Sequence, residues 1–295
     1  MTANAPCGRI RTRLRLGFVV PRASDISLRL ACTTNGPLIK AAEVTQSSLA
    51  RQATFPPIGR PAFTILIVID GKEIRGVITD WAGVLTTPIL TTVQAWIAAD
   101  AIDWGSYRTV MRTWVFDAYG QDGSGNPVHA LERGECSGAE FERMLAAELL
   151  RVDGGPVVAD GLLRRMFAAS LPVPAMYDTI RTLRGAGFGT ALLSNSWGCD
   201  EYPRADFPAL FDAVVISAEV GMRKPEPGIF RHAAGTLGLE PAECVFIDDI
   251  EANVNAAVAC GMTAMVHTDA AATATALQDL LGVPLAWSRP ANLVR

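Results

Sequence analysis

The chain has 295 residues, of which 49% are hydrophobic and 19% are charged. This balance is typical of a folded globular protein with a sizeable core, and it excludes an intrinsically disordered chain. The net charge of −4 hides an asymmetry, because residues 1–60 hold nine Lys or Arg and only two acids, leaving 17 basic and 28 acidic residues for the rest. The excess of acidic residues outside residues 1–60 argues against nucleic acid as a partner.

Membrane, disulfide and zinc patterns are missing from the sequence. The longest apolar run, at 63–69, has the length of a strand and falls far short of the roughly 20 residues of a membrane span. The three histidines lack zinc-binding spacing. Because there is no CxxC pair and no cleavable signal sequence, we expect a reduced, cytoplasmic protein with free thiols. The cysteines are Cys7, Cys32, Cys136, Cys199, Cys244 and Cys260.

Residues 1–60 show no sustained helix or strand period and are rich in arginine. A disordered tail, an organelle-type targeting peptide and a start codon assigned too early all fit this composition. We favour a disordered or artefactual extension and assign it no chemistry.

Two β-rich runs begin the organised part of the chain. Phe63–Ile69 is followed by the turn sequence Asp70-Gly71-Lys72, which predicts a hairpin into a second strand ending at Asp80. Asp70 also ends an apolar run. It lacks the small-residue turn that follows Asp80, so only Asp80 is taken as functional.

Residues 90–183 have apolar side chains at helical spacing, which predicts an inserted helical cap. The expected helices are Leu90–Ala101, Tyr107–Tyr119, Ala139–Leu150, Val157–Ala169 and Pro174–Leu183. Strands and helices alternate after residue 184, with strands expected at Phe188–Leu193, Phe211–Ile216, Cys244–Ile247 and Thr263–His267. This alternation predicts an α/β fold with a doubly wound, Rossmann-like parallel sheet, whose core comprises residues 61–89 and 184–295.

Polar residues stand at or just beyond the ends of the predicted strands: Asp80, Ser194, Lys224, Asp248 and Asp249. The carboxyl ends of parallel strands share one edge of a sheet, so these residues can meet. The set suits phosphoryl transfer, with Asp80 as nucleophile, Ser194 as donor to the phosphoryl group and Lys224 balancing charge. Asp249 and Asp80, with a backbone carbonyl, would hold Mg²⁺, which prefers oxygen ligands.

Four segments resemble, in order, the motifs of the haloacid dehalogenase superfamily, in its phosphatase branch with a helical cap. They are VITDWAGVLTTP, LLSNSW, EVGMRKPEPGIF and VFIDDIEANVNAA. The resemblance covers about residues 75–283. The GVLT turn and the fourth motif also resemble the amino-terminal phosphatase domain of soluble epoxide hydrolases.

The resemblance implies an aspartyl-phosphate on Asp80 and magnesium held by Asp80, Asp249 and the Ala82 carbonyl. Asp248 would assist through water, and Asn195 would support the substrate. The implied partner is a small phosphorylated metabolite, and the protein would be a monomer or homodimer. In this branch, cap residues choose the leaving group, and the candidates here are 120–127 and 131–136.

Ala82 departs from the family pattern. Phosphatases of this superfamily usually carry at this position a second aspartate, which serves as acid and base. Metal binding through the backbone survives the change, but acid–base help, typically worth about 10²–10⁴-fold, does not. Glu132 or Glu135 of the cap are candidate substitutes.

Two other readings stay open. The first is a dehalogenase, which also lacks the second aspartate. It needs no metal, however, and the Asp248–Asp249 pair is most simply held by a cation. The second reading is a non-catalytic protein that binds a phosphate ester. Arg223, beside Lys224, either touches phosphate or is a solvated surface charge.

Overall fold

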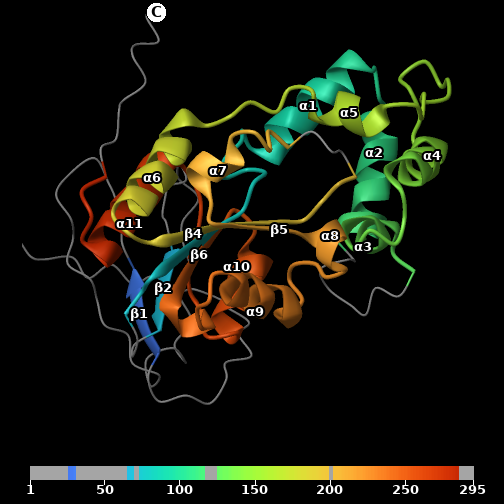
Figure 1. Ribbon diagram of the computed structural model, residues 1–295. Helices are drawn as coiled ribbons and strands as arrows, with labels where there is room; N and C mark the ends of the chain where they lie inside the picture. Colours follow the sequence, from blue (N-terminus) through green and yellow to red (C-terminus); the bar gives the residue numbers. More distant parts are fainter. Residues whose placement is uncertain (1–25, 31–64, 70–72, 117–124, 199–201, 286–295) are drawn as a thin grey trace, which may run out of the picture.

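The computed structural model describes residues 26–30, 65–69, 73–116, 125–198 and 202–285. Asp70 and most of residues 1–60 lie outside these ranges, so the expectations for them are not tested. Figure 1 shows a sheet covered by helices, with a second group of helices at one end.

A seven-stranded sheet forms the centre of the fold, with the order β1-β2-β7-β6-β3-β4-β5. The five strands from β7 to β5 are parallel, and β2 and β1 extend the β7 edge in antiparallel orientation. The predicted doubly wound α/β fold is therefore confirmed. The strands are β1 Ile26–Leu30, β2 Ile65–Ile69, β3 Gly76–Thr79, β4 Gly189–Ser194, β5 Ala213–Ile216, β6 Cys244–Asp248 and β7 Thr263–Val266.

The predicted hairpin between β2 and β3 is wrong. Strand β3 is buried and pairs in parallel with β4 on one side and β6 on the other, so it has no free edge. Strand β2 instead pairs with β7, where Leu66 lies opposite Met265. Strand β1, at Ile26–Leu30, pairs with β2 inside the segment expected to lack regular structure.

Helices cover both faces of the sheet. On one face, α6 (Pro174–Gly185), α7 (Phe207–Leu210) and α11 (Ala270–Leu281) pack against the strands. On the other lie α9 (Pro227–Thr236) and α10 (Glu251–Ala259). Two short helices, α8 (Ser217–Val220) and η3 (Pro241–Glu243), precede α9 and β6.

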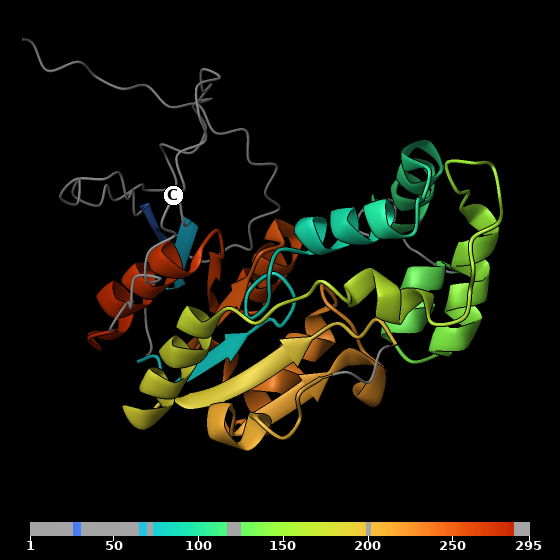
Figure 2. The same cartoon turned by 90° about the horizontal axis from the view of Figure 1, so that it is seen from above.

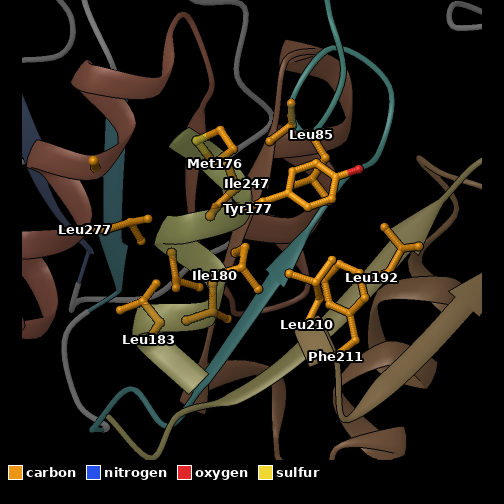
Figure 3. Packing of buried hydrophobic residues seen from close by; sticks show 14 of the residues in the cluster. Leu85, Met176, Tyr177, Ile180, Leu183, Leu192, Leu210, Phe211, Ile247 and Leu277 are labelled. Atoms are coloured by element: carbon orange, nitrogen blue, oxygen red, sulfur yellow. The ribbon is translucent and has the colours of Figure 1, made fainter. Parts of the chain in front are cut away.

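Helix α6 belongs to the core, although residues up to 183 were assigned to the cap. Met176, Ile180 and Leu183 are fully buried at a spacing of three to four residues, so they form one apolar stripe. Figure 3 shows this stripe with Ile247 of the sheet on one side and Leu277 of α11 on the other. The cap therefore ends before α6, in the stretch that follows α5.

The cap has a hydrophobic core of its own, which includes Trp96, Phe141 and Leu145. Figure 2 shows it beyond the arrowheads of the parallel strands. Its elements are α1 Ile89–Ala99, α2 Trp104–Met111, the π-helix η1 Arg112–Phe116, α3 Pro127–Glu132, α4 Gly138–Glu148 and α5 Leu162–Phe167. No helix in the described ranges is both long and apolar enough to cross a bilayer.

Two cap helices differ from expectation. Helix α3 was not predicted; it begins where the Asn126 side chain accepts hydrogen bonds from the backbone of Val128 and His129, with Pro127 in the first turn. The helix expected from Val157 begins only at Leu162. It follows Gly161, whose φ of 65° is left-handed.

His267 follows β7 at the edge of the sheet where the parallel strands end. Its backbone N–H donates to the carbonyl of Asp248 (2.8 Å), and its Nδ1 lies 2.8 Å from Thr273 Oγ1. The side chain is buried, and this burial lowers the pKa of His267 to about 4. The folded protein therefore keeps this imidazole neutral at pH values where an unfolded chain protonates it.

We expect His267 to make folding stability fall with acidification. Between about pH 6.5 and 4 the unfolded chain binds a proton here that the folded chain does not, which removes up to about 3 kcal/mol of stability as the pH falls. In His267→Gln this contribution is lost, so urea unfolding at pH 7 and pH 4.5 will show a smaller pH dependence than in the wild type. His232→Gln, at an exposed site on α9, is the control; an unchanged pH dependence in His267→Gln would contradict the assignment.

Candidate active site

Asp80 lies directly after β3, where the chain turns sharply. The backbone N–H groups of Leu85 and Thr86 donate to the carbonyl of Trp81, at 2.8 and 3.1 Å, and close this turn. The Oδ1 atom of Asp80 accepts from the Trp81 N–H (2.7 Å) and lies 2.7 Å from Lys224 Nζ. No described residue hydrogen-bonds to Oδ2, so this oxygen is the one available for chemistry.

Lys224 is held at both its backbone and its side chain. Its N–H donates to Asn195 Oδ1 (2.8 Å), and its carbonyl accepts from Asn195 Nδ2 (3.0 Å). The side chain is 1% exposed, and Nζ lies 2.7 Å from both Asp80 Oδ1 and Asp248 Oδ2. The ammonium group therefore joins the ends of β3 and β6.

Asp248 uses its carboxylate within the protein. Besides Lys224, it accepts from the Ile250 N–H (2.8 Å) and from Asn253 Nδ2, which is 3.1 Å from each oxygen. These bonds fix the acid as a partner of Lys224. The sequence analysis missed Asn253, although a polar side chain in the first turns of the helix after the Asp248–Asp249 pair is a signal for it.

Asp249 differs from its neighbour. Its Oδ1 is buried without a hydrogen-bond partner. Gly83, with a φ of 84°, approaches this carboxylate so closely that a Cβ there would overlap Oδ2. One oxygen from each of Asp80, Asp248 and Asp249 lies within 4.8 Å of the others. An unpartnered buried carboxylate oxygen beside two further acids fits a hard divalent cation such as Mg²⁺.

Burial and mutual repulsion shape the charges of this cluster. Burial raises the pKa of Asp80, and Lys224 opposes this while Asp248 and Asp249 add to it. Burial and Asp248 raise the pKa of Asp249 to about 6. Burial alone would lower the pKa of Lys224, but Asp248 and Asp80 raise it overall, so the amine stays charged. With one cation among three acids, the cluster favours a bound dication.

Ser194, at the end of β4, lies 2.9 Å from the phenolic oxygen of Tyr202 through its Oγ. Tyr202 was not predicted from the sequence and belongs to an aromatic cluster around Trp81 that includes Tyr177 and Phe207. Their rings meet edge to face, which fixes Trp81 beside Asp80.

A cavity of about 810 Å³ connects the cluster to the cap. Asp80, Ser194, Lys224 and Asp249 lie at its polar end, and Ala82 is also in the lining. The cap and the loop after β4 contribute mainly apolar side chains, namely Ile89, Val93, Met111, Met166, Phe167 and Trp197.

The two cap acids proposed as substitutes at Ala82 differ in position. Glu132 lines the cavity but forms a buried ion pair with Arg223. Glu135 is exposed and is not part of the cavity lining. Arg223 is 2% exposed, so the expectation of a solvated surface charge is wrong. Burial raises the pKa of Glu132, and Arg223 opposes this by holding the carboxylate in an ion pair.

Comparison with known proteins is consistent with this arrangement. The chain is 26% identical to bifunctional epoxide hydrolase 2 of Sus scrofa over 226 residues, 72% of this chain and 40% of that protein. It is 29% identical to a sesquiterpene phosphatase of Aspergillus oryzae, over 51% of this chain and 77% of that one. The chain thus spans less than half the length of the epoxide hydrolase.

Two solved structures are similar in fold. A predicted HAD-like hydrolase of Porphyromonas gingivalis has a TM-score of 0.49 and 25% identity, covering 71% of this chain and 98% of that one. A HAD-family enzyme of Bacteroides thetaiotaomicron, in complex with magnesium and inorganic phosphate, has a TM-score of 0.45 and 22% identity, covering 66% and 95%.

The family profile described as haloacid dehalogenase-like hydrolase matches residues 74–261, which is well over half of the chain and includes all four motifs. The chain belongs to the haloacid dehalogenase-like hydrolases.

Proposed function

We propose that this chain is a magnesium-dependent phosphatase that cleaves a phosphate monoester through an aspartyl-phosphate on Asp80. The observation that carries the proposal is that the three acids differ in their hydrogen bonds. Asp80 Oδ2 is free of hydrogen bonds, Asp248 is fully engaged, and Asp249 has a buried oxygen without a partner. This pattern supports one nucleophile, one anchor for Lys224 and one metal ligand.

The metal would be held by Asp80, Asp249 and the carbonyl of Ala82. When bound, Mg²⁺ supplies positive charge for the phosphoryl oxygens and the surrounding carboxylates. When all three acids are ionised, the cluster carries two more negative charges than Lys224 balances, and this repulsion adds to burial in raising the pKa of Asp80 and Asp249. An anionic phosphate ester would be repelled by such a site, so the cation also makes substrate binding possible.

In the first step, Asp80 Oδ2 attacks phosphorus, and the bond from phosphorus to the leaving oxygen breaks. Lys224 and the Trp81 N–H hold Oδ1 and thereby aim Oδ2 into the cavity. Ser194 would bind a phosphoryl oxygen, and Asn195, whose amide bonds to the Lys224 backbone, would support this side of the substrate. In the second step, water attacks phosphorus and releases phosphate, which regenerates the carboxylate.

The leaving oxygen receives no proton from position 82. Because Ala82 has no acidic group and Glu132 is paired with Arg223, the proton must come from solvent water. Turnover should therefore be slow for alcohols that leave poorly. The same acids argue against a metal-free dehalogenase, since Asp249 would then be a buried anion without a counterion.

The leaving group is proposed to be apolar and larger than a triose or a similar small metabolite. The cavity beyond the acids is lined mainly by aliphatic and aromatic side chains, and its 810 Å³ is ample for a drug-sized molecule. The name of the Aspergillus oryzae relative, a sesquiterpene phosphatase, supports the same class of substrate.

Asp80→Asn is expected to abolish magnesium-dependent phosphate release, by about 10³-fold or more, because the nucleophile is lost. Release of inorganic phosphate from 4-nitrophenyl phosphate measures this. The control is Asp279→Asn, since Asp279 is exposed on α11 and does not line the cavity. Ester binding without release by the wild type would favour a non-catalytic protein. Metal-independent release of halide from 2-haloacids would favour the dehalogenase.

Ala82→Asp is expected to raise kcat on alkyl phosphates, because it supplies the missing acid; such groups are typically worth about 10²–10⁴-fold. The gain should be smaller on 4-nitrophenyl phosphate, whose leaving group needs little protonation. Ala82→Asn is the matched control, because asparagine has nearly the same shape as aspartate but no acidic proton. Equal kcat values for the Asp and Asn variants would refute the account of the leaving step.

If the leaving group is apolar, the KM for n-alkyl phosphates should fall as the alkyl chain becomes longer. Each added CH₂ that enters the cavity should lower KM by up to about fourfold, measured below the micelle-forming concentration. Met166→Gln, in the cavity wall, should flatten this dependence, while Leu150→Gln, at an exposed cap position, should not. A KM independent of length in the wild type would rule out the apolar class.

A further inference from the structure

Glu132 is the last residue of α3 and connects the cap to both loops that carry the active site. Its carboxylate pairs with Arg223, the residue before Lys224, and both side chains are almost completely buried, at 2% and 3% exposure. Its backbone carbonyl accepts from Ser217 Oγ (2.5 Å), which in turn accepts from the Ser196 N–H (2.7 Å).

The side chain of Asn195 also lies close enough to this carboxylate to stabilise its ionised form. An asparagine amide has two N–H donors and one carbonyl oxygen. In Asn195 one N–H donates to Lys224 O, and the oxygen accepts from Lys224 N. The amide thus holds the lysine backbone on both sides, and its side chain lies beside the Glu132 carboxylate.

A second ion pair joins the same two segments, and its acid also accepts from the Arg223 N–H (3.4 Å). Arg133 of the cap pairs with Glu226, and these side chains are 27% and 36% exposed. Neither residue lines the cavity. The two pairs therefore offer a comparison: both dock the cap on the loop of Lys224, but only Glu132 also lies beside the Asn195 side chain.

We propose that Glu132 is a positioning residue, which acts from the cap through Asn195 and Arg223 to hold Lys224 between Asp80 and Asp248. Its carboxylate fixes the orientation of the Asn195 amide and balances the Arg223 cation, so the lysine loop takes its place only when α3 is docked. The consequence for turnover rests on the proposed function, whereas the placement of Lys224 does not. This role also differs from that of a substitute proton donor at Ala82.

The first experiment measures the accessibility of Lys224 directly. The chain contains only three lysines, Lys40, Lys72 and Lys224, so trace acetylation of the folded protein followed by mass spectrometry resolves each one. Two double variants are compared: Glu132→Leu with Arg223→Met, and the matched control Arg133→Leu with Glu226→Gln, whose amide oxygen can still accept from the Arg223 N–H. Removing both charges of a pair avoids leaving a buried ion without its partner.

Lys224 should be strongly protected in the wild type and in the control. In the variant without Glu132 and Arg223 it should react about tenfold faster or more, because the hydrogen bonds that hold its loop are lost. Equal reactivity in the two double variants at matched thermal stability would show that α3 only docks the cap. Unchanged protection in both would also overturn the proposal. This readout needs no turnover, so it stands even if the phosphatase assignment fails.

The second experiment tests whether Glu132 acts through Asn195. Glu132→Gln should lower kcat on 4-nitrophenyl phosphate by about 10- to 100-fold, as for residues that orient catalytic groups. In an Asn195→Ala background the same change should have little further effect, because the shared path is already broken. Additive losses would overturn the proposal. The proposal would also be overturned if Glu132→Gln removed one limb of the pH–rate profile while Lys224 stayed protected. That result would identify Glu132 as a proton donor or acceptor in the reaction.

Discussion

Everything in this site depends on one buried ammonium group among three carboxylates. Lys224 Nζ lies 2.7 Å from an oxygen of Asp80 and from one of Asp248, with Asp249 close by. Bringing three acids this close together is unfavourable unless cations offset the repulsion, and buried charges need partners. Lys224 offsets part of it. The remaining charge explains why the protein would need a divalent cation to assemble a working site.

The topology of the sheet brings these groups together. Strands β3 and β6 are parallel neighbours with Thr79 opposite Ile247, so the residues that follow them, Asp80 and Asp248, emerge side by side. The chain adds β4 and β5 on one side of β3 and then crosses to form β6 and β7 on the other. The crevice where strand order reverses is where ligands bind in open α/β sheets. The cavity opens at this edge.

The sequence was sufficient for the parallel part of the fold, because each of those strands is a short apolar run followed by polar residues. It failed for β2, since an Asp-Gly turn between two β-rich runs predicts a hairpin whether or not the strands pair. Strand β3 is paired with β4 and β6 and has no edge left for β2. Of the site, Asp80, Lys224 and Asp249 were predictable as strand-end groups. Tyr202 and the Glu132–Arg223 pair were not, because no local pattern links residues 91 positions apart.

The cap thus serves two ends of the same cavity. Side chains of α1, α2 and α5 line the apolar part of the cavity, where the proposed leaving group would lie, and α3 contacts the loops at its polar end. In the proposed phosphatase, position 82 offers no acid to protonate the leaving group, so the rate would rest on the placement of charge around phosphorus. Electrostatic placement acts best in a dry, rigid site. A cap that closes the cavity and also fixes Lys224 through Glu132 would supply both conditions in one docking event.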